Sequence, residues 1–223
     1  LPAGPDGRTA PSALDGLAQP AGLVMQGPNF LGGVEGLPAG ADKIHAAGGL
    51  LAAGFSGPFA LGLLKAPGQC GADIAFGEGQ GLGLTQSFGG PGLGLLAAKS
   101  EFMRQIPGRL VGETVDNQGR RGFVLTLSTR EQHIRRGKAV SNICSNAGHC
   151  ALTAAVFMAA IGGTGFRKMA QVNRDLAEYF KAGLVAAGFV PLSDAPTFNE
   201  FALLAPAGFA AKHAKLRPRK ILA

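Results

Sequence analysis

The sequence predicts an α/β protein with a largely buried sheet, and three observations support this fold class. Short apolar runs of strand length recur through the first hundred residues, at 22–26, 50–53, 73–76 and 93–98. Helical or glycine-rich segments separate these runs, as crossover connections separate the strands of a buried sheet. Hydrophobic residues make up 46% of the 223 residues, which is enough to fill a core.

The first elements are bounded by residues suited to their ends. Residues 1–20 are rich in Pro, Gly and Ala and are expected to be irregular. The strand at 22–26 is expected to stop at the turn Gly27-Pro28-Asn29. A helix is expected near 40–47, followed by Gly48, because glycine suits the left-handed position after a helix. The strands at 50–53 and 73–76 come next, and Gly77 closes the second.

A hairpin and a polar helix are expected in the middle of the chain. Residues 110–115 and 122–127 alternate in polarity around Asp116-Asn117-Gln118-Gly119, which predicts an antiparallel pair with a tight turn. A helix is then expected to begin at Thr129, because Thr129 and Gln132 have the spacing of a capping box. Ser145 is expected to cap the helix that follows.

Two further helices and a small strand pair are expected toward the end. The apolar run 151–161 predicts a helix that ends at Gly162-Gly163. Residues 166–187 predict an amphipathic helix that ends at Gly188. Short strands at 189–192 and 199–204 suggest a second, smaller α+β unit. The apolar stripe of the amphipathic helix consists of Met169, Val172, Leu176, Phe180 and Leu184.

Composition excludes several classes of protein. Aromatic residues are 7% of the chain and Trp is absent, so a base-stacking surface for nucleic acid is not expected. No apolar run approaches the length that spans a bilayer, so no membrane partner is expected. The three cysteines, Cys70, Cys144 and Cys150, have no metal-ligand spacing. Reduced thiols in a cytoplasmic protein without a metal site are therefore expected.

Residues 129–144, TREQHIRRGKAVSNIC, form the densest polar cluster, and residues 104–138 carry five of the seven net positive charges. The cluster suggests that an anionic ligand or partner is held there. An ion-pair network involving Glu131 would explain the same cations. His133 could act in acid–base chemistry or bond to a neighbouring residue. Ser141 and Asn142 could form hydrogen bonds across a subunit contact or cap the turn before the next helix. The candidate residues are Arg130, Glu131, His133, Arg135, Arg136, Ser141 and Asn142.

A second set of candidates follows the strand at 73–76. Glu78 and Gln80 lie in the glycine-rich stretch Gly77–Gly81, where a backbone can approach another group closely. Glu78 could face a shared pocket or belong to a plain turn. Ser87 begins Ser87-Phe88-Gly89-Gly90-Pro91, which could be a backbone nest for an anion or a tight turn.

The polar cluster and several other segments resemble the glycine cleavage system P-protein family, the glycine dehydrogenases (decarboxylating), and in particular subunit 1 of the two-subunit form. The likeness covers about residues 20–204, and the ending AAKHAKLRPRKILA does not resemble the family. The segments that carry it are PGRLVGETVDNQGRRGFVLTLS, TREQHIRRGKAVSNIC, QGPNF, GADI, GEGQ, SFGGP and APTFNEF.

The resemblance implies a fold type I pyridoxal-phosphate (PLP) architecture and a partial chain. Residues 1–160 would be the later part of the PLP-transferase-like large domain, which is incomplete. Residues 161–223 would be part of a small α+β C-terminal domain.

The resemblance also implies where the cofactor-binding residues should lie. A carboxylate for the pyridinium nitrogen should end the strand after His45-Ala46-Ala47-Gly48, where this chain has Ala53-Gly54. The Schiff-base lysine should follow the strand that begins at Asp73, where this chain has Gly77–Gly81. Both groups are absent, as expected of subunit 1, so no catalytic residue is assigned to this chain.

The implied enzyme decarboxylates glycine and passes the aminomethyl group to the lipoylated H-protein. In that setting P-protein subunit 2 holds the PLP, and this chain completes a pocket wall, channel or interface. A non-catalytic assembly protein and an independent PLP enzyme are the alternatives.

Overall fold

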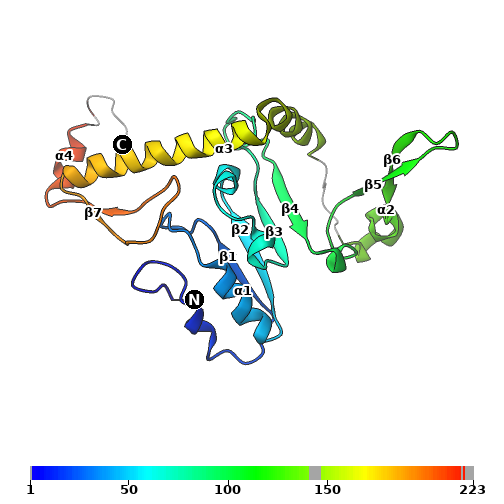
Figure 1. The fold of residues 1–223 in the computed structure, drawn as a ribbon, viewed down its shortest axis with the longest axis horizontal. Coiled ribbons are helices and arrows are strands. Elements are labelled where there is room, and N and C mark those ends of the chain that lie inside the picture. The colour runs from blue at the N-terminus through cyan, green and yellow to red at the C-terminus, as the bar shows by residue number, and fades with distance from the viewer. Residues whose placement is uncertain (1, 141–146, 217, 219–223) are drawn as a thin grey trace.

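The computed structural model describes residues 2–140, 147–216 and 218 (Figure 1). Its centre is a four-stranded sheet in the order β1-β2-β3-β4. The first three strands run parallel and β4 runs antiparallel to β3. The strands are β1 (Gly22–Gln26), β2 (Leu50–Phe55), β3 (Ile74–Glu78) and β4 (Gly94–Ala98), so all four sequence-predicted strands are confirmed.

The connections are short and mostly helical. Helix α1 (Leu37–Ala46) crosses from β1 to β2 and starts three residues before the expected Gly40. Pro38 explains the earlier start, because proline fits the first helical turn, where no intrahelical N–H partner is needed. Gly48 has φ +81°, as expected for the residue after a helix. Four 3-10 turns complete this half: η1 (Pro11–Leu14), η2 (Pro58–Gly62), η3 (Pro67–Cys70) and η4 (Ser100–Phe102).

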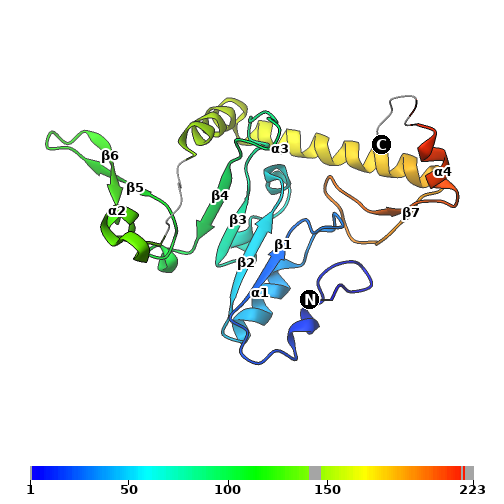
Figure 2. The same ribbon diagram turned by 180° about the vertical axis from the view of Figure 1, so that it is seen from behind.

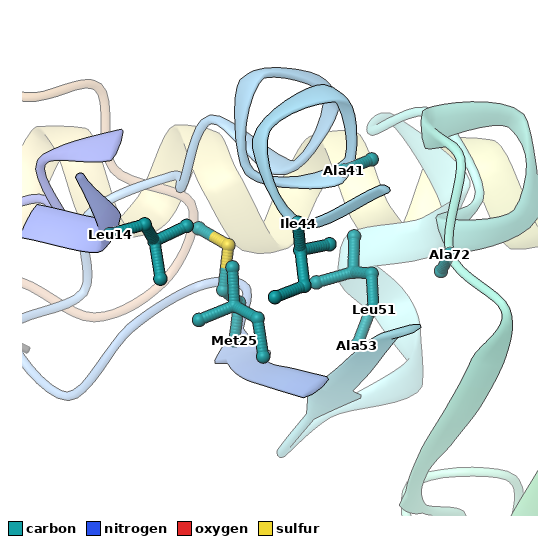
Figure 3. Close-up of a cluster of buried hydrophobic side chains, with 8 residues drawn as sticks. Leu14, Met25, Ala41, Ile44, Leu51, Ala53 and Ala72 are labelled. Carbon is teal, nitrogen blue, oxygen red and sulfur yellow. The ribbon is translucent and has the colours of Figure 1, made fainter. Parts of the chain in front are cut away.

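The main core lies between α1, η1 and one face of the sheet (Figure 3). Ile44 of α1 and Leu51 of β2 are completely buried and meet at its centre. Burying side chains of this size removes apolar surface from water and stabilises the fold by about 1.5–3 kcal/mol each. The cluster consists of Leu14, Leu23, Met25, Ala41, Ile44, Leu51, Ala53 and Ala72.

The opposite face of the sheet is open, so the expectation of a largely buried sheet is wrong. Burial alternates along β1, where Val24 is 70% exposed between two buried neighbours. Phe76 in β3 and Leu96 in β4 are 39% and 49% exposed. Helix α1 packs against one face only, and the described residues supply no second layer of comparable extent.

An arm extends from the sheet beyond β4 (Figures 1 and 2). Strands β5 (Leu110–Val115) and β6 (Arg121–Thr126) form the predicted antiparallel hairpin. Three short turns follow: η5 (Ser128–Arg130), α2 (Gln132–Arg135) and η6 (Arg136–Lys138). The predicted capping box is wrong. Helix α2 begins after Glu131 with no side-chain cap, and Thr129 lies inside η5.

The long helix α3 (Gly148–Ala186) is broken at Gly162, which has φ +62° and ψ 176°. The predicted helix end therefore marks a real change of direction, although helix resumes immediately afterwards (Figure 1). The first part packs on Leu82 and Leu93 through Cys150 and Ala154. In the second part, Ala170 packs with Ala60 of η2. Ser145 lies outside the described residues.

The C-terminal strands are shorter than expected. Strand β7 (Val190–Pro191) pairs antiparallel with β8 (Leu203–Leu204), and α4 (Phe209–Ala214) follows. The predicted apolar stripe of α3 is on the surface: Val172 is 49% exposed and Leu176 62%.

Within the described residues, α3 is long and apolar enough to cross a membrane by length and composition. The expectation that no run approaches that length is therefore corrected. One such helix is weak support for a membrane protein, because core helices of soluble proteins pass the same test. In the most apolar 18-residue stretch of α3, 11% of the residues are buried.

Candidate functional site

Three of the predicted residues share one hollow at the carboxyl end of β3. Glu78 ends the strand, Gln80 follows in the turn, and Ser87 lies in the loop that returns to β4. The hollow has a volume of about 540 Å3 and is completed by Gln86, Phe88 and residues 89–92. Binding sites of α/β sheets occur at this carboxyl edge of the parallel strands.

The Glu78 carboxylate is fixed by the backbone of the hollow. The N–H groups of Gln80 and Leu93 donate to Glu78 Oε1 at 2.9 and 3.1 Å. The N–H of Gly79 donates to the carbonyl of Leu93 at 2.7 Å, which joins the two walls. An added Cβ at Gly79 would lie 3.1 Å from Leu93, so glycine permits this close approach. Glu78 is thus an oriented acceptor on the rim of the hollow.

The loop around Ser87 is a turn that exposes an aromatic ring. The Gly90 N–H donates to the Ser87 carbonyl at 3.4 Å, and Gly89 has φ +101°. Phe88 also has a positive φ, +52°, and its side chain is fully exposed. This geometry agrees with the tight-turn interpretation. The anion nest stays a hypothesis.

Arg130 is a structural residue at the base of the arm. Its side chain is buried, with 7% exposed, and donates to three backbone carbonyls. Nε binds the carbonyl of Leu127 at 3.2 Å, Nη2 binds that of Gly108 at 3.0 Å, and Nη1 binds that of Ile106. Carbonyls can satisfy a buried guanidinium without a carboxylate partner. The arginine therefore joins the two ends of the hairpin to η5.

Glu131 pairs with different cations from those expected. Its Oε2 lies 3.4 Å from Arg109 Nε and 3.8 Å from His133 Nδ1. Its Oε1 is buried with no hydrogen-bond partner among the described contacts. His133 therefore lies within ion-pair distance, but not hydrogen-bond distance, of Glu131, and its role stays a hypothesis.

The two predicted clusters are not brought together. Arg135 and Arg136 are exposed on the arm, which projects away from the sheet in both views (Figures 1 and 2), and neither residue lines the hollow. Arg136 has φ +52°, a rare backbone conformation for a side-chain-bearing residue. Ser141 and Asn142 lie outside the described residues. The arm therefore cannot serve the hollow of its own chain in this arrangement.

Sequence reasoning missed an ionic cluster around a buried acid at the opposite, amino-terminal edge of the sheet. Asp73, 3% exposed, accepts hydrogen bonds from the Leu51 N–H at 2.7 Å, His45 Nε2 at 2.7 Å and Lys99 Nζ at 2.5 Å. Burial raises the pKa of Asp73, but the bonds from Lys99, His45 and Leu51 outweigh it and lower the pKa from 3.8 to about 2. The sequence does contain a signal for this cluster: Asp73 directly precedes β3, and Lys99 directly follows β4, the strand antiparallel to β3.

The residues of the carboxyl edge do not fit a PLP site. An added Cβ at Gly54 would lie 2.9 Å from the ring of Phe76, and one at Gly77 would meet the ring of Phe55. Aromatic rings therefore fill the space beside the two positions where the resemblance places the acid and the lysine. Lys99 is held by Asp73 at the other edge. Ala53 and Gly54 stand at the position of the acid, and residues 77–81 contain no lysine, so neither of these two positions supplies the group that PLP needs.

Within the part of the chain that the structure describes, no three His, Cys, Asp or Glu side chains come together in a group that could hold a metal ion. Cys70 and Cys150 are free thiols, and both are buried. Cys144 lies outside the described residues.

The sequence and the structure were compared with known proteins. The model of the family described as "Glycine cleavage system P-protein" matches residues 8–220. A relative from Desulfotalea psychrophila, "Probable glycine dehydrogenase (decarboxylating) subunit 1", is 51% identical over 223 residues, which are 100% of this chain and 50% of the relative. A relative of the same name from Exiguobacterium sibiricum is 52% identical over 90% of this chain and 45% of its own length.

These matches extend the likeness beyond residues 20–204 at both ends. The ending that was expected to differ from the family lies largely within the matched region. The chain spans about half the length of the curated relatives it matches.

Solved structures agree with the sequence relatives. The crystal structure of a glycine decarboxylase (P-protein) in inhibitor-bound form matches with a TM-score of 0.82 and 50% identity, over 89% of this chain and 46% of that one. An aspartate aminotransferase from Thermus thermophilus matches with a TM-score of 0.62 and 17% identity, over 96% of this chain and 56% of that one. The second match shows the fold alone, that of the fold type I PLP enzymes.

Proposed function

The chain belongs to the glycine cleavage system P-protein family, and from that premise we propose that it is part of the non-lysine subunit of a glycine dehydrogenase (decarboxylating). The complete enzyme decarboxylates glycine and transfers the aminomethyl group to a lipoylated H-protein. A second P-protein subunit holds the PLP through its own lysine, and this chain supplies a wall of the shared site.

One observation carries the proposal. The carboxyl edge of the sheet, where a fold type I enzyme binds its cofactor, is filled by Phe55 and Phe76 and bears no lysine. Glu78 occupies the end of β3 instead, with its carboxylate fixed by two backbone N–H groups. PLP, when bound on the partner, supplies the electron sink for decarboxylation. The residues of this chain line the shared site, where they help to bind and orient the substrate and exclude water.

The hollow and the exposed Phe88 support a role at a subunit boundary. Glu78 and Gln80 are polar groups on rigid backbone, suited to orienting a ligand or a partner side chain. A fully exposed phenylalanine beside them is typical of a residue that a second chain covers. We propose that the complete enzyme is a cytoplasmic heterotetramer. The free, buried Cys70 and Cys150 are consistent with a reducing compartment.

Borohydride reduction tests the absence of a cofactor lysine. The chain is mixed with PLP, alone and together with a lysine-bearing P-protein subunit 2, reduced, and digested for peptide mapping. The modified lysine is expected on the partner only. Stable modification at Lys65, Lys99 or Lys138 that a Lys→Arg variant abolishes would overturn the proposal.

Glycine–bicarbonate exchange separates an enzyme subunit from an assembly protein. Exchange is expected only when both subunits are present. Glu78→Gln is expected to lower the exchange rate of the mixture at least threefold, and Glu101→Gln, an exposed acid outside the hollow, serves as the matched control. Full exchange by the lysine-bearing subunit alone would instead favour the assembly role.

A further inference from the structure

The β5–β6 hairpin presents an apolar face to solvent. Side chains alternate along each strand, and the register places Val111 opposite Leu125 and Glu113 opposite Phe123, so these residues share one face. We call it the hairpin face and define its apolar part as Val111, Val115, Phe123 and Leu125. Their exposed fractions are 63%, 65%, 61% and 56%.

The charges on the hairpin face are already paired. Arg121 Nη2 lies 2.9 Å from Glu113 Oε2, and its guanidinium lies 5.0 Å from the centre of the Phe123 ring. The pair covers one edge of the phenylalanine and leaves the remaining apolar surface open. A partner that covers this face would therefore bury apolar side chains without stranding an unpaired charge.

Among the described residues, no second layer covers the hairpin face. A two-stranded sheet is marginal in water unless another element packs on it. Arg130 fixes the base of the hairpin through the carbonyls of Ile106 and Gly108, so the arm is held in an extended position beyond β4 (Figures 1 and 2). An exposed apolar patch on a fixed projecting element is typical of a protein–protein contact.

The charge of the arm selects among partners. Residues 104–138 carry eight Lys or Arg and three Asp or Glu, a net charge of +5. Pairing of two such arms would place +5 against +5, which disfavours a second copy of this chain in an arm-to-arm contact. A complementary surface has an apolar groove with carboxylates around it.

We propose that the hairpin face docks into an apolar, acid-rimmed groove on the lysine-bearing subunit. This inference rests on the proposed function for the existence of that partner. Arg135 and Arg136, which are exposed on the same arm, set the orientation, and Phe123 is the central anchor.

Binding of the separately purified lysine-bearing subunit tests the inference with variants on the two faces of one strand. Phe123→Thr removes the anchor from the hairpin face. Val124→Thr makes a smaller apolar-to-polar change on the opposite face of the same strand, where Val124 is 49% exposed. Threonine keeps a high strand propensity in both variants. Phe123→Thr is expected to weaken association at least tenfold, about 1.4 kcal/mol, and Val124→Thr less than twofold.

Hydrogen exchange of residues 110–126 in the unmodified subunit gives a second measurement. Protection is expected to increase when the partner subunit is added. If the two subunits associate, equal binding of Phe123→Thr and Val124→Thr with unchanged exchange overturns the docking site and leaves the proposed function intact. Full protection of the hairpin before the partner is added would show that the same subunit covers it, which also overturns the inference. Failure of the unmodified subunits to associate refutes both.

Discussion

Replacing Asp73 by Asn is expected to lower the free energy of unfolding by about 2–3 kcal/mol near neutral pH. The carboxylate is buried and accepts bonds from Lys99, His45 and the Leu51 N–H. The difference between a pKa of 3.8 and one of about 2, at 1.36 kcal/mol per unit, corresponds to about 2 kcal/mol. An asparagine keeps the shape and one acceptor, but it loses the charge that pairs with Lys99.

The sign of the pH dependence follows from the direction of the shift. The pKa of Asp73 is lower in the folded chain, so its stabilising contribution is complete above about pH 4 and is lost as the pH falls from about 4 to about 2. The stabilities of the parent and Asp73→Asn should therefore converge over that interval. Urea denaturation followed by far-ultraviolet circular dichroism, at low protein concentration, measures both curves.

Asp42→Asn is the control for the Asp73 experiment, because Asp42 is exposed on α1. It is expected to change stability by less than about 0.5 kcal/mol. A constant difference between the parent and Asp73→Asn from about pH 7 to pH 2 would refute the electrostatic reasoning. Equal stabilities at neutral pH would refute the structural role of the cluster.

Two further predictions concern backbone packing and the arm. Arg130→Met leaves the carbonyls of Leu127, Ile106 and Gly108 without their hydrogen-bond donor, and it is expected to speed amide hydrogen exchange over residues 106–127 by at least tenfold. Arg135→Met is the control, because Arg135 is exposed, and it is expected to leave exchange over those residues unchanged. Gly32→Ala adds a Cβ against the carbonyl of Glu200 at φ +84° and is expected to cost more than about 3 kcal/mol in urea denaturation. Gly48→Ala, at φ +81° in open space, is expected to cost only about 1 kcal/mol.

The sheet and the hairpin could be predicted because their signals are local. Apolar runs of four to six residues bounded by glycine mark β1 to β4, and alternation around Asp116–Gly119 marks the hairpin. The extent of burial could not be predicted in the same way. Val24 is as apolar as its buried neighbours in β1, and its exposure depends on the absence of a second covering layer, which is a property of the assembly.

The candidate site was predicted in part. Glu78, Gln80 and Ser87 meet in one hollow because they flank the same strand connection. Arg130 was chosen for its charge, yet its bonds go to backbone carbonyls that sequence spacing cannot reveal. The Asp73 cluster was missed because Lys99 and His45 come close only through the strand order β2-β3-β4 and the crossover helix α1.

Gly162 sets the angle between the two parts of helix α3. Its combination of φ +62° and ψ 176° is accessible almost only to glycine, so no other residue can hold this bend without strain. An unbroken rod of 39 residues would extend about 58 Å and could not follow both packing surfaces. The backbone of one residue therefore lets the first part of α3 pack on Leu82 and Leu93 while the second part packs on Ala60 of η2. A side chain at this position would meet no neighbour, so its cost would come from the backbone conformation alone.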